Sequence, residues 1–270
     1  MDTVCPAGTK AWLLCLGYMT VDEGWLIRGG NQSFASQKGV ATVNKRRLLP
    51  MYSVLIEHPG AGLLLWETGP GPNYPEVWGP ETSDAFSRSN YEPVQELDAA
   101  IASTGHSIKE ITAVIQGHLH LDHSGGLTFF KGTDVPIYCH TRELKNAFYS
   151  VATKADIGVY LPHYLDLSLN WQTFDEKEME FAQDGLVGMQ INLPNDGTYL
   201  FTSDQFHVKE NYLDGVAPGW VTRDHNAWFD SLQRVRRLAL RKNAVVVMGH
   251  DIDVCNQVWE KQEGISKPLS

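Results

Sequence analysis

The feature that most constrains this sequence is a run of metal-binding side chains placed directly after a predicted strand. Residues 111–115 are apolar and predict a buried strand that ends at Gly117. Four potential ligands then follow within six residues: His118, His120, Asp122 and His123. Imidazole suits Zn, Fe, Ni and Cu, and a carboxylate adds negative charge for the cation. The pattern therefore predicts a metal site at the end of a strand.

The spacing within this run predicts where its side chains point. Alternate residues of an extended segment face the same side, so His118 and His120 should share one face. The turn that follows would aim Asp122 and His123 at a neighbouring position. One segment can thus serve two adjacent metal ions that share a hydroxide. The alternative is an exposed histidine-rich turn, which the density of ligands at a strand end disfavours.

Two further strand ends carry single side chains of the same chemistry. Asp204 follows a strand predicted at 198–202, and His250 follows one predicted at 244–248. Alone, such an aspartate is usually a turn former and such a histidine is usually structural. Together with the histidine run, they place ligands at several strand ends along one edge, as a metallohydrolase requires.

The rest of the chain predicts strands and helices in one α+β domain spanning residues 1–270. Strands at 52–57 and 63–67 flank a turn at 58–62, and Asn195-Asp196-Gly197 joins strands at 189–193 and 198–202, the strongest hairpin signal. A strand at 135–139 precedes a helix capped by Thr141. Helical spacing follows Pro93, at Val94, Leu97, Ala100 and Ile101, and recurs at Trp228, Leu232, Val235 and Leu238. This order predicts two mixed sheets packed together and flanked by helices.

Composition excludes several classes of protein. The chain has 270 residues, 43% of them hydrophobic, so it can bury a sizeable core. A net charge of −10 with no basic block disfavours nucleic-acid binding. No apolar run approaches membrane-spanning length, which is roughly 18 residues, and the start lacks a signal-peptide pattern. Four scattered cysteines are typical of an intracellular protein, so a cytoplasmic location is expected. The Gly/Pro-rich loop at 69–80 could form an oligomer interface.

These residues resemble the metallo-β-lactamase superfamily, and within it the N-acyl-homoserine lactonase branch and its fungal lactonase and lactamase relatives. The superfamily's His-x-His-x-Asp-His is matched by His118-Leu119-His120-Leu121-Asp122-His123. Its bridging aspartate is matched by Ser203-Asp204, and its last histidine by Gly249-His250-Asp251. Lys209-Glu210-Asn211-Tyr212 also matches the lactonase branch. The resemblance covers most of the chain, from about Tyr52 to Asp251.

The resemblance implies an αββα sandwich that binds one or two zinc ions, with Mn, Fe or Co also compatible. It implies that His118 and His120 bind the first metal, that Asp122, His123 and His250 bind the second, and that Asp204 bridges both. It further implies a hydrolase in which metal-bound hydroxide opens a small cyclic ester or amide. The substrate would be an N-acyl-homoserine lactone, as in quorum quenching, or a lactam such as benzoxazolinone. Asp122 or His207 would carry the proton to the leaving group.

The sequence departs from the family at three places. The family's Pro-Gly-His ligand segment is missing, because Gln183-Asp184-Gly185 runs straight into Leu186-Val187-Gly188. The first metal then lacks one ligand, so we expect weakened or absent activity. Glu67 replaces the aspartate of the family's Asp-Thr-Gly. Its side chain is one methylene longer, which puts a contact that supports the metal ligands in doubt. His207 stands where lactonases carry a tyrosine that polarises the substrate carbonyl.

Other functions stay open at this point. The chain could be an inactive member retained for binding, or a thioester or phosphoester hydrolase of the same superfamily. Four aromatic residues in predicted loops either line an apolar substrate cleft or belong to the core: Trp25, Tyr74, Trp78 and Trp220.

Overall fold

The computed structural model describes residues 3–33, 44–156, 158–175, 186–222 and 224–270. The strands of this part of the chain form two sheets. The larger sheet has the order β4-β1-β2-β3-β5-β6-β7, and the smaller has the order β10-β9-β8. The strand bounds are β1 Lys10–Asp22, β2 Arg46–His58, β3 Gly62–Trp66, β4 Ser87–Ser89, β5 Ile111–Ile115, β6 Pro136–His140, β7 Asn170–Phe174, β8 Met189–Leu193, β9 Gly197–Phe201 and β10 Val245–Val247.

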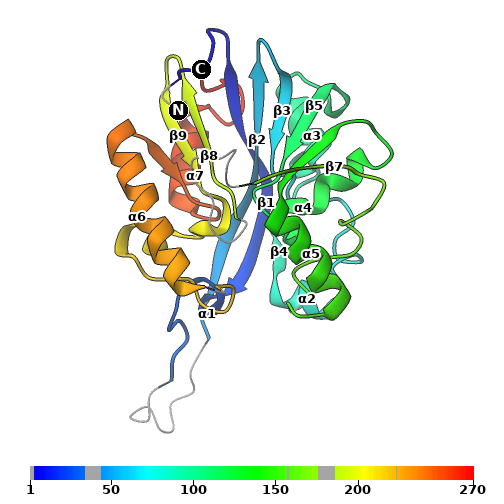
Figure 1. Ribbon diagram of the computed structural model, residues 1–270, viewed down its shortest axis with the longest axis vertical. Helices are drawn as coiled ribbons and strands as arrows, with labels where there is room; N and C mark the ends of the chain where they lie inside the picture. The colour runs from blue at the N-terminus through cyan, green and yellow to red at the C-terminus, as the bar shows by residue number, and fades with distance from the viewer. Residues whose placement is uncertain (1–2, 34–43, 157, 176–185, 223) are drawn as a thin grey trace.

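Helices cover the outer faces of both sheets (Figure 1). The α-helices are α1 Glu23–Leu26, α2 Pro80–Ala85, α3 Leu97–Ser103, α4 Leu121–Ser124, α5 Thr141–Thr153, α6 His225–Lys242 and α7 Ile252–Lys261. Shorter 3₁₀ turns lie at Pro93–Gln95, Ile108–Glu110, Gly125–Phe130 and Ser203–Gln205, and a π-helical turn lies at Glu210–Asp214. The helices α3, α4 and α5 lie beyond the larger sheet, and α6 lies against the smaller one. The predicted αββα arrangement is confirmed.

Alternating side chains of the larger sheet build two separate cores. In β1, Trp12 and Leu14 pack toward the helices, whereas Ala11 and Leu13 pack toward the smaller sheet. The core between the sheets also takes Phe201 from β9. A sheet buried on both faces has no polar side, which explains why β1 reads as a continuous apolar run and not as an alternating one.

The predicted elements are confirmed, with differences at their ends. Both predicted hairpins form, as the pairs β2–β3 and β8–β9. The helix predicted from Pro93 is interrupted, because the backbone of Glu96 is extended, with ψ 144°, between the 3₁₀ turn and α3. The N-cap of α5 is His140, whose side chain accepts from the Arg142 amide, and not Thr141. The strands β1, β4 and β7 and the helix α7 were not predicted.

The aromatic residues of the predicted loops divide between core and surface. Trp78 is buried, contacts Tyr74 edge-on and donates through Nε1 to the Tyr164 hydroxyl, so these residues belong to the core. Trp220 is 79% exposed. Trp25 packs edge-on against Phe86 at the rim of a recess described below.

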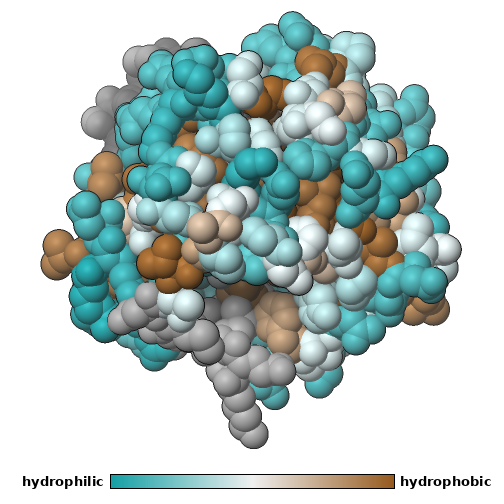
Figure 2. Space-filling view, turned by 90° about the horizontal axis from the view of Figure 1, so that it is seen from above, coloured by the Kyte–Doolittle hydropathy of each residue, from teal (hydrophilic) through white to brown (hydrophobic). Residues whose placement is uncertain are grey.

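The surface mixes polar and apolar side chains, as Figure 2 shows for one face. Among the described residues, no helix combines the length and the apolar character needed to cross a membrane.

Candidate metal centre

The predicted ligand residues meet where four strands end. The strands β3 and β5 are parallel, with Trp66 paired to Ile115, and β9 and β10 are parallel, with Phe201 paired to Val247. Parallel strands bring their carboxyl ends to the same edge. One pair belongs to each sheet, so the segments after all four strands converge. The side chains that these segments bring together are Glu67, His118, His120, Asp122, His123, Asp204, His207 and His250.

Four side-chain atoms form a compact cage: Asp122 Oδ2, His123 Nε2, His250 Nε2 and Asp204 Oδ1. His123 Nε2 lies 3.4 Å from the Asp122 oxygen, 3.3 Å from the Asp204 oxygen and 3.3 Å from His250 Nε2. His250 Nε2 lies 3.3 Å from the Asp122 oxygen and 3.0 Å from the Asp204 oxygen. Ligands at zinc distances in a tetrahedron are about 3.3–3.6 Å apart. Asp122, His123 and His250 therefore offer ligand atoms close enough to hold one cation, with Asp204 Oδ1 beside both imidazoles.

A second group shares Asp204 with this cage. His118 Nε2 lies 3.4 Å from Asp204 Oδ2, and ligand atoms of His118, His120 and Asp204 lie within 4.8 Å of one another. His118 Nε2 is buried without a hydrogen-bond partner among the described residues. An unpaired buried donor or acceptor is costly, and a cation at this position would satisfy it. Asp204 thus presents one oxygen to each group.

The charges of the metal-free site compensate one another. Burial raises the pKa of Asp122, but the charges of His123 and His250 outweigh it and hold this pKa below its ordinary value. Burial likewise opposes the ionised form of Asp204, yet His207, His250 and His123 hold its pKa well below the usual range. Burial lowers the pKa of His123, whereas Asp122 and Asp204 raise it well above its usual value. The carboxylates are therefore ionised and ready to bind a cation.

A supporting layer orients the imidazoles from behind. The Ser203 hydroxyl donates to Glu67 Oε1 at 2.8 Å and lies 3.0 Å from His118 Nδ1. Glu67 Oε1 also lies 3.6 Å from His123 Nδ1, and His250 Nδ1 lies 2.9 Å from the Pro50 carbonyl oxygen. The sequence left it open whether Glu67, which is one methylene longer than the family's aspartate, would still contact the site. In the structure it does. Such partners fix the orientation of the ring that binds a metal.

Backbone geometry at two strand ends is specialised to build this layer. Glu67 and Ser203 have positive φ values of 60° and 47°. Non-glycine residues seldom adopt this conformation, which occurs disproportionately at functional sites. It turns the chain sharply at the ends of β3 and β9, so that both side chains point into the cluster.

His207 lies beside Asp204, in the cluster where the sequence places it. Its Nε2 is 3.3 Å from Asp204 Oδ2, and its ring stacks on that of His250 with centroids 5.9 Å apart. The His250 amide donates to the His207 carbonyl oxygen at 2.8 Å. Asn211 is fully buried, and its Oδ1 accepts from the amides of His207 and Val208. Asn211, which belongs to the stretch that matches the lactonase branch, therefore anchors the loop that carries His207. The sequence motif alone does not reveal this role.

An open cleft leads to the second group, that of His118, His120 and Asp204. It contains about 650 Å³ of empty space, and His118, His120 and Tyr160 are among the residues that line it. Tyr160 packs edge-on against His120, with centroids 4.8 Å apart, and donates to Glu143 Oε1 at 3.1 Å. Neither Tyr160 nor Glu143 was identified from the sequence, because neither lies in a motif.

The predicted deletion point falls at the edge of this cleft. Gln183-Asp184-Gly185 lies outside the described residues. Beyond it, the side chain of Leu186 lines the cleft, and the Val187 amide donates to the Gly117 carbonyl oxygen at 3.0 Å. The chain therefore returns to the described part of the structure directly beside the histidine run.

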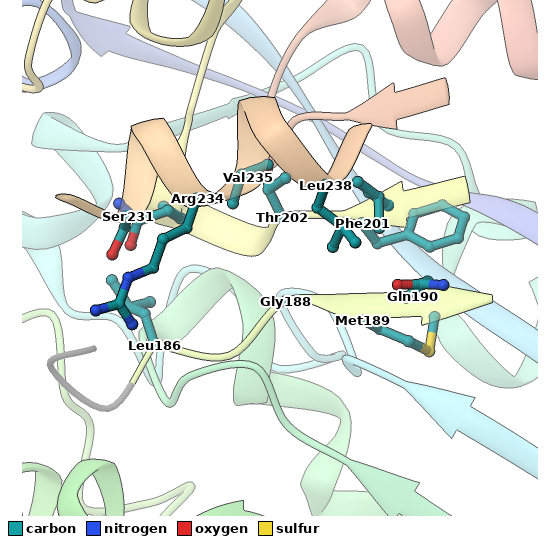
Figure 3. A pocket seen from close by; sticks show the side chains of 12 residues that line it. Leu186, Gly188, Met189, Gln190, Phe201, Thr202, Ser231, Arg234, Val235 and Leu238 are labelled. Carbon is teal, nitrogen blue, oxygen red and sulfur yellow. The ribbon is translucent and has the colours of Figure 1, made fainter. Parts of the chain in front are cut away.

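Two apolar spaces adjoin the cleft. A recess next to His120, Asp204 and His207 is lined by several hydrophobic side chains, namely Met19, Val21, Trp25, Leu26, Leu49, Phe86, Leu121, Val159 and Val221. A larger groove of about 620 Å³ lies between α6 and the strands β8 and β9 (Figure 3). It shares Leu186 and Gln205 with the metal cleft.

Comparison with known proteins places this geometry in a family. The model of the metallo-β-lactamase superfamily matches residues 46–250. The N-acyl homoserine lactonase AiiB of Agrobacterium fabrum (strain C58 / ATCC 33970) is 25% identical over 265 residues, covering 90% of this chain and 94% of that protein. The N-acyl homoserine lactonase AiiA of Bacillus thuringiensis subsp. kurstaki is 25% identical over 245 residues, covering 87% and 95%.

Solved structures share the fold. One is an N-acyl homoserine lactone hydrolase with N-hexanoyl-L-homoserine bound at its catalytic metal centre, at a TM-score of 0.73, 20% identity and coverage of 94% and 96%. Another is AidC, a dizinc quorum-quenching lactonase, at a TM-score of 0.64, 14% identity and coverage of 93% and 89%. The chain belongs to the metallo-β-lactamase superfamily, and within it resembles the N-acyl homoserine lactonases.

Proposed function

We propose that this protein is a metal-dependent hydrolase that opens a small cyclic ester or amide, with an N-acyl homoserine lactone as the favoured substrate. The observation that carries the proposal is the cage of Asp122, His123, His250 and Asp204 atoms, in which both imidazoles lie 3.0–3.4 Å from both carboxylates, about the separation of ligands on one zinc ion. The second oxygen of Asp204 faces a further group of histidines. The lactonases among its relatives support the same reaction.

In this proposal His118 and His120 hold a first ion, and Asp122, His123 and His250 hold a second. Asp204 contributes one oxygen to each. Histidine and carboxylate ligands suit zinc, and also Mn, Fe or Co. The bound metal would supply a water of lowered pKa and polarise the carbonyl to be attacked.

Asp122 is suited to move the proton. Its contacts with the cage involve Oδ2, which leaves Oδ1 available. When water adds to the lactone carbonyl, one of its protons must leave. When the acyl–oxygen bond then breaks, the ring oxygen must gain a proton to become an alcohol. A carboxylate at the reacting carbon can accept the first proton and deliver it to that oxygen, leaving a carboxylic acid that ionises.

The surroundings of the cluster favour a substrate with an apolar substituent. The recess beside His120 and Asp204 is lined mainly by hydrophobic side chains, and apolar walls with few polar groups are typical of small-molecule sites. An acyl chain would remove apolar surface from water there, at about 0.8 kcal/mol for each buried methylene. A compact lactam such as benzoxazolinone is the second candidate, and would fill only the space at the metal ligands.

Hydrolysis assays test the proposal directly. Metal-loaded protein is given an N-acyl homoserine lactone or benzoxazolinone, with and without added Zn or Mn. Asp122→Asn should lower kcat/KM by about 100-fold or more, since it removes both a ligand charge and the proton carrier. Asp253→Asn is the matched control, because Asp253 is exposed and pairs with Lys209. Absence of turnover by folded, metal-loaded protein would contradict the proposal and favour a binding role.

A further inference from the structure

Compared with the family's ligand pattern, the first metal position lacks one protein ligand. The described residues that follow the missing Pro-Gly-His segment offer no donor in its place. Leu186, the first described residue after 176–185, has an apolar side chain and lines the cleft. Val187 is buried in the core between the two sheets. Within the described residues, a further ligand for the first site must therefore come from another element.

We propose that His207 Nε2 is the missing ligand, so that His118, His120 and His207 hold the first ion together with Asp204. The inference rests on the proposed function only in taking the cluster as a metal centre.

The contacts of Asp204 carry this inference. Its Oδ1 faces His123 Nε2 at 3.3 Å and His250 Nε2 at 3.0 Å, which are two edges of the tetrahedral cage. Its Oδ2 faces His118 Nε2 at 3.4 Å and His207 Nε2 at 3.3 Å. Each oxygen thus has two imidazole nitrogens within 3.4 Å, about the separation expected between a carboxylate and an imidazole that bind one ion.

His207 is held rigidly in this position. Its side chain is 5% exposed, and its amide donates to the buried Asn211 side chain at 3.0 Å. Asn211 Nδ2 in turn donates to the carbonyl oxygens of Leu26 and Val216. The loop is therefore fixed on both sides, and little side-chain entropy is lost when the imidazole binds a metal.

The ring orientation of His207 presents Nε2, and not Nδ1, to Asp204. His207 Nδ1 is buried and has no hydrogen-bond partner among the described residues. Nε2 is the nitrogen that faces the cluster. A tyrosine hydroxyl at this position would be a poor zinc ligand compared with imidazole. The exchange of tyrosine for histidine therefore suits ligation.

Metal titration tests the assignment without any substrate. Metal-free protein is titrated with Zn in competition with a chromophoric chelator, and with Co, whose visible absorption reports four-coordinate binding. Wild-type protein should hold two equivalents, a result that would contradict the weakened or absent activity expected from the missing segment. His207→Ala should keep one equivalent and weaken the other by at least about 100-fold, because even partners behind the ligands are worth 10–100-fold. His163→Ala is the control, since His163 is exposed and far from the cluster in sequence and contacts.

Two results would overturn the inference: wild-type protein that binds a single equivalent, or His207→Ala protein that binds two with unchanged affinity. Thermal denaturation of each metal-free variant checks folding, and His207→Gln replaces His207→Ala if the smaller side chain prevents folding. Loss of one equivalent in His207→Gln supports the inference as well. If two equivalents bind through His207 and no lactone or lactam is hydrolysed, then the metal assignment stands and the proposed function fails.

Discussion

Substitution of Gly249 should weaken both metal binding and folding, by amounts that can be measured separately. Gly249 follows β10 and packs directly on the bridging carboxylate: an added Cβ would lie 2.6 Å from Asp204 Oδ1 and 2.7 Å from the Ser203 carbonyl oxygen. Ordinary contact begins at 3.4 Å, so Gly249→Ala requires a shift of about 0.8 Å in one or both partners. The φ of Gly249 is not positive, so alanine adds no backbone strain and only space is at issue.

The expected magnitudes follow from that shift. Metal sites tolerate displacements of about 0.2 Å in ligand distance, so Asp204 Oδ1 would leave its place in the cage with His123 and His250. We expect the affinity of the second ion to fall by about 10–100-fold or more. Overpacking should also cost about 1–3 kcal/mol of unfolding free energy in the metal-free protein.

Chelator-competition titration measures the first effect, and urea denaturation in the presence of a chelator measures the second. Gly60→Ala is the matched control, because Gly60 lies in an exposed turn where the nearest atom to an added Cβ, His58 Cε1, is 3.6 Å away. If Gly249→Ala protein binds both ions with wild-type affinity, then the packing of Gly249 on Asp204 does not control the cage, and the reasoning is refuted.

Three further predictions follow from the same geometry. Asn211→Ala removes a fully buried side chain with four hydrogen bonds, and should cost about 3 kcal/mol or more in urea denaturation; a loss below about 1 kcal/mol would contradict this. Chelation should lower the melting temperature, since an ion at about 1,000 times its Kd contributes about 4 kcal/mol; equal melting temperatures with and without chelator would count against a resident metal. In metal-free protein the lowered pKa values of Asp122 and Asp204 contribute stability that is lost as pH falls below about 4. The raised pKa values of His123 and His250 contribute stability that is complete below about pH 6.5 and lost as pH rises through the folded values. Thermal denaturation in chelator should therefore show a maximum between about pH 4 and 6.5, and stability that keeps rising to pH 9 would contradict it.

Local pattern was sufficient for several parts of the fold. The hairpin at Asn195-Asp196-Gly197 forms as predicted, because its turn chemistry acts over a few residues; Gly197 has a φ of 82°. The stripe of Trp228 and Leu232 marks α6 for the same reason. By contrast, β1 was missed because both of its faces are buried, and β7 was missed because it is a short, only partly buried strand at the end of the sheet order.

Short stretches of sequence are enough to identify the histidine run, the acid after β9 and the histidine after β10. The sequence by itself therefore determined that this chain carries the residue types of a metal centre. It also determined the gap before Leu186. Only the tertiary structure decided that His207 lies beside the cluster, since His207 and His118 are far apart along the chain and approach the same oxygen of Asp204. Their meeting depends on two parallel strand pairs in different sheets ending at one place. Sheet packing is long-range, so no local pattern encodes it.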